Sequence, residues 1–486
     1  MSRPIQSCVK NPRIGIIGGG IAGATVALCL GELGLDVTLI EKGSSLVNGP
    51  PICHLHAGGN LYREISDAQC FTLLRESIDL VRLYPHAVDY RPTVIAVPKN
   101  DAGLPEDLLP RLHKLQKEYQ HLINKDSKNS VLGASEHYFK LFTRQQIEAL
   151  KNTEVVNKPQ TLTEWMIPFA HHVNLEQLKF PVILVQEYGL NLFRLAASAE
   201  LALRKITHCS LLVNSEVTNI HALANCWQVE YQQGSEITVT EFDYLINAAG
   251  FRTGTVDDML DFKRQRLVEF KAAYVTQWPQ CSAIWPEVIF FGDRGTPEGM
   301  AQFTPYPDGY FQLHGMTPLV TLFDNGLVES ANHSAQPQLN PHFIEKIDKG
   351  WSNAEINLRS QAAIDHISRF IPDFAQNATV SAKPLFGAQQ IPGDDAELRA
   401  AGVSFVGEFY ARCEIVKASS ALTVSNKIIK QLIKLGYLTH KDNGDRVFKI
   451  THAITEPEIT QHAQKLCASR DYPVSLARCN FPQLGH

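Results

Sequence analysis

The chain has 486 residues, of which 44% are hydrophobic and 20% charged, and its formal net charge is −5. This length exceeds what one hydrophobic core usually organises, so we expect two globular domains, whose segments can be interleaved along the chain. The acidic balance gives no electrostatic reason for a nucleic-acid partner. No apolar run reaches the roughly 20 residues of a membrane-spanning helix, and no signal sequence precedes the first predicted strand, so we expect a cytoplasmic protein.

The glycines near the N-terminus have the spacing of a dinucleotide-binding turn, at Gly18, Gly20 and Gly23. A β-branched apolar run over 14–17 precedes them and a helical pattern follows, which predicts strand, loop and helix in that order. A second strand ends at Glu41, 23 positions after Gly18, where a carboxylate can bind a ribose diol. The turn therefore predicts an adenine dinucleotide without a 2′-phosphate and leaves the choice between NAD and FAD open.

The rest of the chain alternates helical patterns with short apolar runs. We expect helices at 67–83, 106–124, 192–203, 352–370 and 420–435. We expect strands at 93–98, 180–185, 211–213, 227–231, 237–239, 243–250 and 405–407. Residues 270–323 are rich in aromatic and β-branched side chains, which predicts a large antiparallel sheet. The tail over 439–486 is polar and carries no motif.

Metal binding is not expected. The ten cysteines include no C-x-x-C pair, which argues against zinc and iron–sulfur sites. The pairs His54 with His56 and His171 with His172 lack the neighbouring carboxylates or cysteines that a metal site needs.

Three motifs occur in one order: the glycine turn with Glu41, the apolar strand that ends in Asn247-Ala248-Ala249-Gly250, and a small-residue loop over 418–421 before a helix. This order resembles the D-amino-acid-oxidase-like (DAO) superfamily of FAD-dependent oxidoreductases. The segments 56–62, 88–90 and 94–97 are similar to its branch of 2-hydroxyglutarate and glycerol-3-phosphate dehydrogenases.

The resemblance implies an α/β fold. A Rossmann-like FAD-binding domain of glutathione-reductase type would be interleaved with a mixed α+β substrate domain that contains the large antiparallel sheet. On this basis we expect the FAD-binding domain at 1–92, 185–262 and 385–436. The substrate domain would take 93–184 and 263–384, and a C-terminal extension 437–486.

The resemblance also implies FAD as the cofactor. The residues expected to hold it are Gly18, Gly20, Ile21, Ala22, Gly23, Glu41, Lys42, His56, Gly58, Gly59, Val217, Ala249, Gly250, Lys417, Ala418, Ser419, Ser420 and Ala421. Lys417, or the N-terminus of the helix after it, would stabilise negative charge on the reduced ring. This loop lacks the glycine that family members often have. His56 resembles a histidine that is covalently joined to the flavin in some amine dehydrogenases, and packing of its loop is the alternative role.

The activity implied is that of a dehydrogenase or oxidase. It would oxidise a small carboxylate-bearing 2-hydroxy acid or amino acid by hydride transfer to the flavin, with oxygen or a quinone as the final acceptor. We expect Arg412 to bind the carboxylate, because a guanidinium fork matches that group. An ion pair with Glu414 or another acid is its alternative role, and Arg252 and Arg294 are the next candidates for the carboxylate.

His314, at the end of an aromatic strand, is the candidate base, since a histidine near neutrality suits proton abstraction from a hydroxyl. A hydrogen-bonded core histidine is its alternative role. Other functions stay open from the sequence: an amine oxidase or demethylase, a flavin-binding or structural protein without catalysis, and an NAD-dependent dehydrogenase. An RNA-modification component on the same scaffold is a further alternative, against which the acidic charge argues.

Overall fold

The glycine turn lies in a six-stranded, mostly parallel sheet. The computed structural model describes residues 11–49, 63, 65–443 and 447–481. In spatial order the strands are β20 (Gly402–Val406), β21 (Tyr410–Glu414), β12 (Tyr244–Asn247), β1 (Arg13–Ile17), β2 (Asp36–Ile40) and β8 (Cys209–Leu212). Only β20 at the edge is antiparallel to its neighbour. The four apolar residues of β1 after Arg13 are buried, as in a strand covered on both faces.

Helices built from small and aliphatic residues cover this sheet. Helix α1 (Ile21–Glu32) follows β1 directly, and its residues from Ala22 to Gly31 are all buried. It packs against α6 (Leu192–Arg204) and α11 (Ala421–Lys434). Helix α2 (Asp67–Leu83) begins at Ser66, whose side chain accepts a hydrogen bond from the Gln69 N–H, and it packs against α11.

The second large layer is a ten-stranded mixed sheet. Its strands are β17 (Leu327–Glu329), β13 (Arg266–Gln277), β16 (Tyr310–Gly315), β15 (Ala301–Pro305), β14 (Glu287–Phe290), β4 (Thr93–Ala96), β6 (Val182–Val185) and β5 (Phe139–Phe142), with β18 (Thr379–Val380) and β19 (Leu385–Pro392) also paired to β13. The aromatic run thus forms part of the predicted large sheet, and the α/β class is confirmed. The predicted domain boundary at 385 differs from the strand pairing, because β19 pairs with β13 over its whole length.

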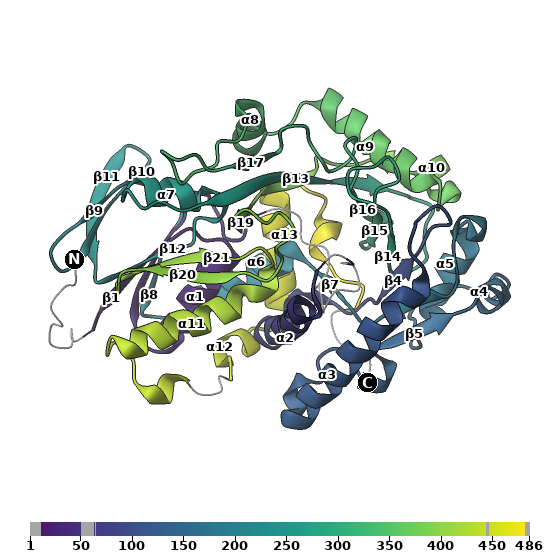
Figure 1. Cartoon of the computed structure of the whole chain (residues 1–486), viewed down its shortest axis with the longest axis horizontal. Coiled ribbons are helices and arrows are strands. Elements are labelled where there is room, and N and C mark those ends of the chain that lie inside the picture. Colours follow the sequence, from purple (N-terminus) through teal and green to yellow (C-terminus); the bar gives the residue numbers. More distant parts are fainter. Residues whose placement is uncertain (1–10, 50–62, 64, 444–446, 482–486) are drawn as a thin grey trace.

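The two faces of β13 have different partners. Its outer face, with Phe270, Ala272 and Tyr274, packs in aromatic clusters beneath α8 (Pro341–Lys349), α9 (Asn353–Ser368) and α10 (Pro372–Asn377). Its inner face, with Glu269, Lys271, Ala273 and Val275, is turned toward the other sheet, since Val275 shares a core with Ile14 and Ile16 of β1. Figure 1 shows β13 as one long strand, with α8 and α9 on one side and α1 and α11 on the other.

Smaller elements complete the fold. The meander predicted after α6 is a three-stranded sheet of β9 (Ser215–Ala222), β10 (Trp227–Gln233) and β11 (Glu236–Phe242). A two-stranded sheet joins β3 (Val88–Asp89) to β7 (Gly189–Leu190). The remaining helices before the C-terminus are α3 (Leu109–Lys125), α4 (Arg144–Leu150), α5 (Ile167–His172) and α7 (Thr253–Asp258). No helix within the described ranges is both long and apolar enough to cross a bilayer.

The C-terminal tail is structured, although its sequence carries no motif. It forms α12 (Lys449–His452) and α13 (Glu456–Ser469). Thr455 and Glu458 cap α13 reciprocally, and the helix packs along α6. The tail therefore belongs to the layer of helices that covers the six-stranded sheet.

Candidate cofactor and substrate site

The glycine turn has the geometry that its spacing predicts. Gly18 has a φ of 100°, and a Cβ there would lie 2.5 Å from the carbonyl oxygen of Ala248. A Cβ at Gly23 would collide with the carbonyl oxygen of Gly18, so α1 packs against the turn only with glycine at this position. At Gly20, by contrast, a Cβ would meet nothing within 4 Å, and this residue lines a cavity.

The N-terminus of α1 opens into that cavity without a side-chain cap. Its N-cap is Gly20, no acidic residue lies in the first turn, and no side chain in the described parts of the chain caps it. Backbone N–H groups at a helix N-terminus bind anions, phosphate groups above all. Glu41 lies beside this turn, where its carboxylate accepts hydrogen bonds of 2.6 Å from the N–H groups of Gly19 and Gly43.

One cavity of about 710 Å³ brings most of the predicted cofactor residues together. Of the predicted set, its walls contain Gly18, Gly20, Ile21, Ala22, Glu41, Lys42, Val217, Ala249, Gly250, Lys417, Ala418 and Ser419. The cavity continues to Gly387 and Gln389 on β19 of the larger sheet, so it extends from the glycine turn to the second layer of the fold. Arg252 lines it as well.

Three of the predicted cofactor residues lie elsewhere. Gly23, Ser420 and Ala421 are described but do not line the cavity. Gly23 faces the turn itself, and the Ser420 hydroxyl donates a 2.6 Å hydrogen bond to Glu76, whose pKa is raised by burial. His56, Gly58 and Gly59 lie outside the described residues.

Arg412 takes the alternative role, and its acidic partner is not Glu414. Its Nε lies 2.7 and 2.8 Å from the two carboxylate oxygens of Asp257, and it is not among the residues that line the cavity. Glu414 instead accepts two hydrogen bonds from Arg264. All five residues of β21 are buried, and side chains alternate between the two faces of a strand. The next residue, Cys413, lines the cavity, so Arg412 lies on the opposite face, where it meets Asp257 of α7.

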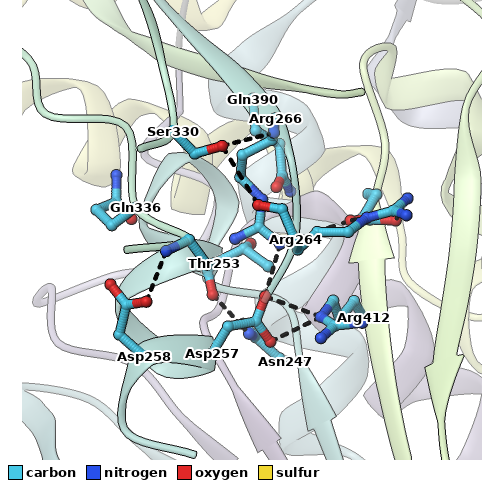
Figure 2. Close-up of polar contacts among 12 residues, drawn as sticks. Asn247, Thr253, Asp257, Asp258, Arg264, Arg266, Ser330, Gln336, Gln390 and Arg412 are labelled. Atoms are coloured by element: carbon cyan, nitrogen blue, oxygen red, sulfur yellow. Dashed lines mark hydrogen bonds and ion pairs between the residues drawn. The ribbon is translucent and has the colours of Figure 1, made fainter. Parts of the chain in front are cut away.

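Asp257 on α7 is shared by three donors, and Figure 2 labels two of them, Arg266 and Arg412. Besides Arg412, it accepts a 2.6 Å hydrogen bond from Arg266 Nη2 and a 2.9 Å bond from the Tyr410 hydroxyl. Burial, followed by the Asp257 charge, raises the pKa of Tyr410 well above its ordinary value. Tyr410 also accepts a 2.8 Å hydrogen bond from Asn247 at the end of β12. One buried carboxylate thus joins β12, α7 and β21 of one layer to Arg266 at the start of β13.

His314 lies on the inner face of the larger sheet. Its Nδ1 is 3.1 Å from the Thr321 hydroxyl, it is half-buried, and it is not among the cavity-lining residues. Gln312, two residues earlier, is opposite Val275, so both share the inner face. The Gln312 side chain is 1% exposed, and neither its amide oxygen nor its nitrogen has a hydrogen-bond partner among the described residues. Such buried groups are normally paired, so this amide indicates a polar partner.

Residues 13–163 match the family model for FAD dependent oxidoreductases (DAO). The chain carries an FAD-dependent oxidoreductase domain. Over these residues the match bears out the predicted superfamily and oxidoreductase class, with FAD as the cofactor of that family. No curated protein matches the chain in sequence.

Solved structures share the fold of this oxidoreductase. Glycerol-3-phosphate dehydrogenase from Bacillus halodurans, complexed with FAD, is 12% identical, with a TM-score of 0.54 over 95% of this chain and 73% of that one. Iminodiacetate oxidase from Chelativorans sp. BNC1 is 13% identical, with a TM-score of 0.55 over 86% and 95%. L-amino acid deaminase from Proteus vulgaris is 14% identical, with a TM-score of 0.55 over 91% and 99%. At these identities the likeness shows the shared fold alone.

Arg470 and Tyr472 are among the cavity residues of the oxidoreductase that the sequence reasoning missed. Both come from the C-terminal tail, where no motif marks them. The capping box at Thr455 is the one local signal, and it predicts a helix rather than a site.

We predict that Asp257→Asn lowers the free energy of unfolding by about 3–5 kcal/mol, because it leaves the buried Arg266 and Arg412 without their shared negative charge. Urea unfolding of the purified oxidoreductase measures the change. Asp261→Asn is the matched control, since Asp261 is exposed and its φ of 53° suits asparagine. Equal stabilities of the two variants would contradict this role of Asp257.

Proposed function

We propose that the chain binds FAD in the 710 Å³ cavity and oxidises a small substrate that carries a carboxylate. The observation that supports this most strongly is the course of the cavity. It begins at the uncapped N-terminus of α1 and at Glu41, which suit a diphosphate and a ribose, and it ends at β19 beside the inner face of the larger sheet. A long two-part cofactor fits such a cavity, with its reactive part near the second layer.

The residues at the glycine turn fit the ADP half of the cofactor. Gly18, Gly20, Ile21 and Ala22 would lie against the diphosphate, and Glu41 would accept hydrogen bonds from the ribose hydroxyls. Lys417 and the neighbouring Ala418 and Ser419 line the cavity beside the start of α11 and would face the ring. When bound, FAD would supply the acceptor for the hydride that leaves the substrate carbon.

Gly20→Ala and Gly23→Ala separate cofactor binding from folding. The alanine at position 20 projects into open space, so we expect an unchanged Tm without cofactor and a weaker FAD affinity, because the methyl group occupies space beside the diphosphate. The alanine at position 23 collides with the carbonyl of Gly18, and we expect a lower Tm without cofactor. Thermal unfolding and flavin titration test the pair. A Gly20→Ala protein with normal FAD affinity would contradict the placement.

The inner face of β13 carries a charge cluster suited to a carboxylate. Lys271 Nζ lies 3.0 Å from Glu269, and Arg294 also pairs with Glu269. Lys271 and Glu269 are opposite Gly387 and Gln389, two of the β19 residues that line the cavity. Burial lowers the pKa of Lys271, and the nearby Arg399 and Arg294 lower it further. Two cations share one carboxylate here, so a second carboxylate, from the substrate, would balance the charge.

His314 and Gln312 stand on the same face as this cluster. For a 2-hydroxy acid we propose that His314 takes the hydroxyl proton, while the Thr321 hydroxyl at its Nδ1 orients the ring. The unpartnered amide of Gln312 would hydrogen-bond the substrate. An amino acid that binds with a neutral amino group has less need of a base, so the amine-oxidising alternative would rest on the same carboxylate cluster without His314.

Anaerobic loss of flavin absorbance tests this proposal against hydroxy acids, amino acids and N-methylated amines. We expect a hydroxy acid or an amino acid to reduce the flavin, and its decarboxylated or amidated analogue to fail. Lys271→Gln should raise the concentration for half-maximal reduction by about 10- to 100-fold, the value of one charge-assisted hydrogen bond.

The exposed Lys263, near the start of β13, supplies the matched control Lys263→Gln, which should behave as wild type. Reduction by an amine without a carboxylate, as fast as by the acid, would overturn the carboxylate assignment and support the amine oxidase.

A further inference from the structure

The C-terminal tail is held against the rest of the fold at both of its ends. At the start of α13, Glu456 accepts hydrogen bonds of 2.7 and 2.6 Å from the buried Arg194 of α6. After α13, the Asn191 side chain donates a 2.8 Å hydrogen bond to the Leu476 carbonyl. The Phe481 N–H donates a 2.9 Å bond to Asp89 on β3. The segment between these contacts is therefore fixed where it passes the cavity.

Arg470, directly after α13, reaches the loop that follows β2. Its Nη2 donates a 2.6 Å hydrogen bond to the Leu46 carbonyl and lies 3.1 Å from the Ser45 hydroxyl, and its Nη1 donates a 3.1 Å bond to the Val47 carbonyl. The Val47 N–H in turn donates a 3.0 Å hydrogen bond to the Gly19 carbonyl in the glycine turn. Arg470 is thus linked through Val47 to the turn that opens α1, and it lines the same cavity.

Acidic side chains balance the charge of Arg470 only in part, since burial lowers its pKa more than Glu200 and Glu41 raise it. Among the described residues the structure shows no ion pair to its guanidinium, and its Nε is buried without a hydrogen-bond partner. Burial lowers the pKa of Arg470 to about 10, which keeps the side chain protonated at neutral pH. A half-buried cation at a cavity wall without a direct ion-pair partner is costly, and an anion bound in that cavity would offset the cost.

We propose that Arg470 is a cofactor-binding residue, and that the C-terminal tail supplies a cationic wall for the diphosphate of the dinucleotide. This inference rests on the proposed binding of FAD in the cavity. The diphosphate is the anion that both Arg470 and the uncapped N-terminus of α1 would share. Tyr472 supports the wall, since its hydroxyl donates a 2.6 Å hydrogen bond to the Pro384 carbonyl and its ring packs under Lys383.

The test compares FAD, ADP and riboflavin as probes of the purified full-length protein without cofactor. Arg470→Gln should weaken the binding of FAD and ADP by about 10- to 100-fold, and it should leave riboflavin binding unchanged, because riboflavin lacks the phosphates. Lys465→Gln removes a positive charge from the exposed side of α13 and should change none of the three affinities.

Arg470→Lys keeps the charge but loses the planar guanidinium with its paired donors, so we expect it to restore part of the FAD and ADP affinity. This variant replaces Arg470→Gln in the test if the glutamine variant does not fold. Equal losses of affinity for riboflavin and ADP would overturn the proposal and would show that Arg470 only stabilises the loop at 45–47. Wild-type affinity for ADP in Arg470→Gln would also overturn it, while the proposed function stands. If the wild-type protein binds neither FAD nor ADP, the proposed function fails as well.

Discussion

The relative position of the two large sheets depends on the contacts of the Asp257 carboxylate. It lies on α7, directly after the strand end that lines the cavity, and it holds Arg412 of β21 and Arg266 of β13 at once. All three side chains are at most 4% exposed. Since an unpaired buried charge is far costlier than a paired one, the arrangement is stable only when β13 starts where Arg266 reaches Asp257. The position of Arg266 at the start of β13 also fixes the register of β19, which pairs with β13. This register places Gly387 and Gln389 at the far end of the cavity.

The positive side chains around the cavity also need negative partners. Lys271 and Arg294 share one carboxylate on the inner face, and Arg470 forms no ion pair in the described residues, where burial lowers its pKa and the charges of Glu200 and Glu41 offset that shift only in part. Buried cations in excess of their counter-ions are unfavourable in the protein alone. Two anionic groups would balance them, a diphosphate at the glycine turn and a substrate carboxylate at the inner face. Binding of cofactor and substrate would therefore also stabilise the fold.

The local features of the site could be predicted from the sequence. The turn from Gly18 to Gly23, the strand before it and Glu41 lie within about thirty residues, and their geometry follows from backbone rules that act over short distances. The walls at Ala249 and Lys417 were predicted from the order of motifs in a family rather than from spacing. The large sheet followed from aromatic and β-branched composition.

The long-range contacts could not be predicted in this way. Arg412 and Asp257 are 155 positions apart, and nothing in either local sequence shows that their side chains meet. The tail illustrates the same limit, because a polar helix with exposed lysines looks like a surface extension until its packing on α6 brings Arg470 to the cavity. Pairing of β19 with β13 likewise depends on tertiary context, which overrides local propensity in sheets.

The most direct test of the account is the absorption spectrum of the purified protein, followed by titration of the protein without cofactor by FAD and by NAD. We predict a yellow protein, or one that gains the flavin bands at one FAD per chain, without saturable binding of NAD. A colourless protein that takes up no FAD and binds NAD would contradict the central claim that this cavity is a flavin site.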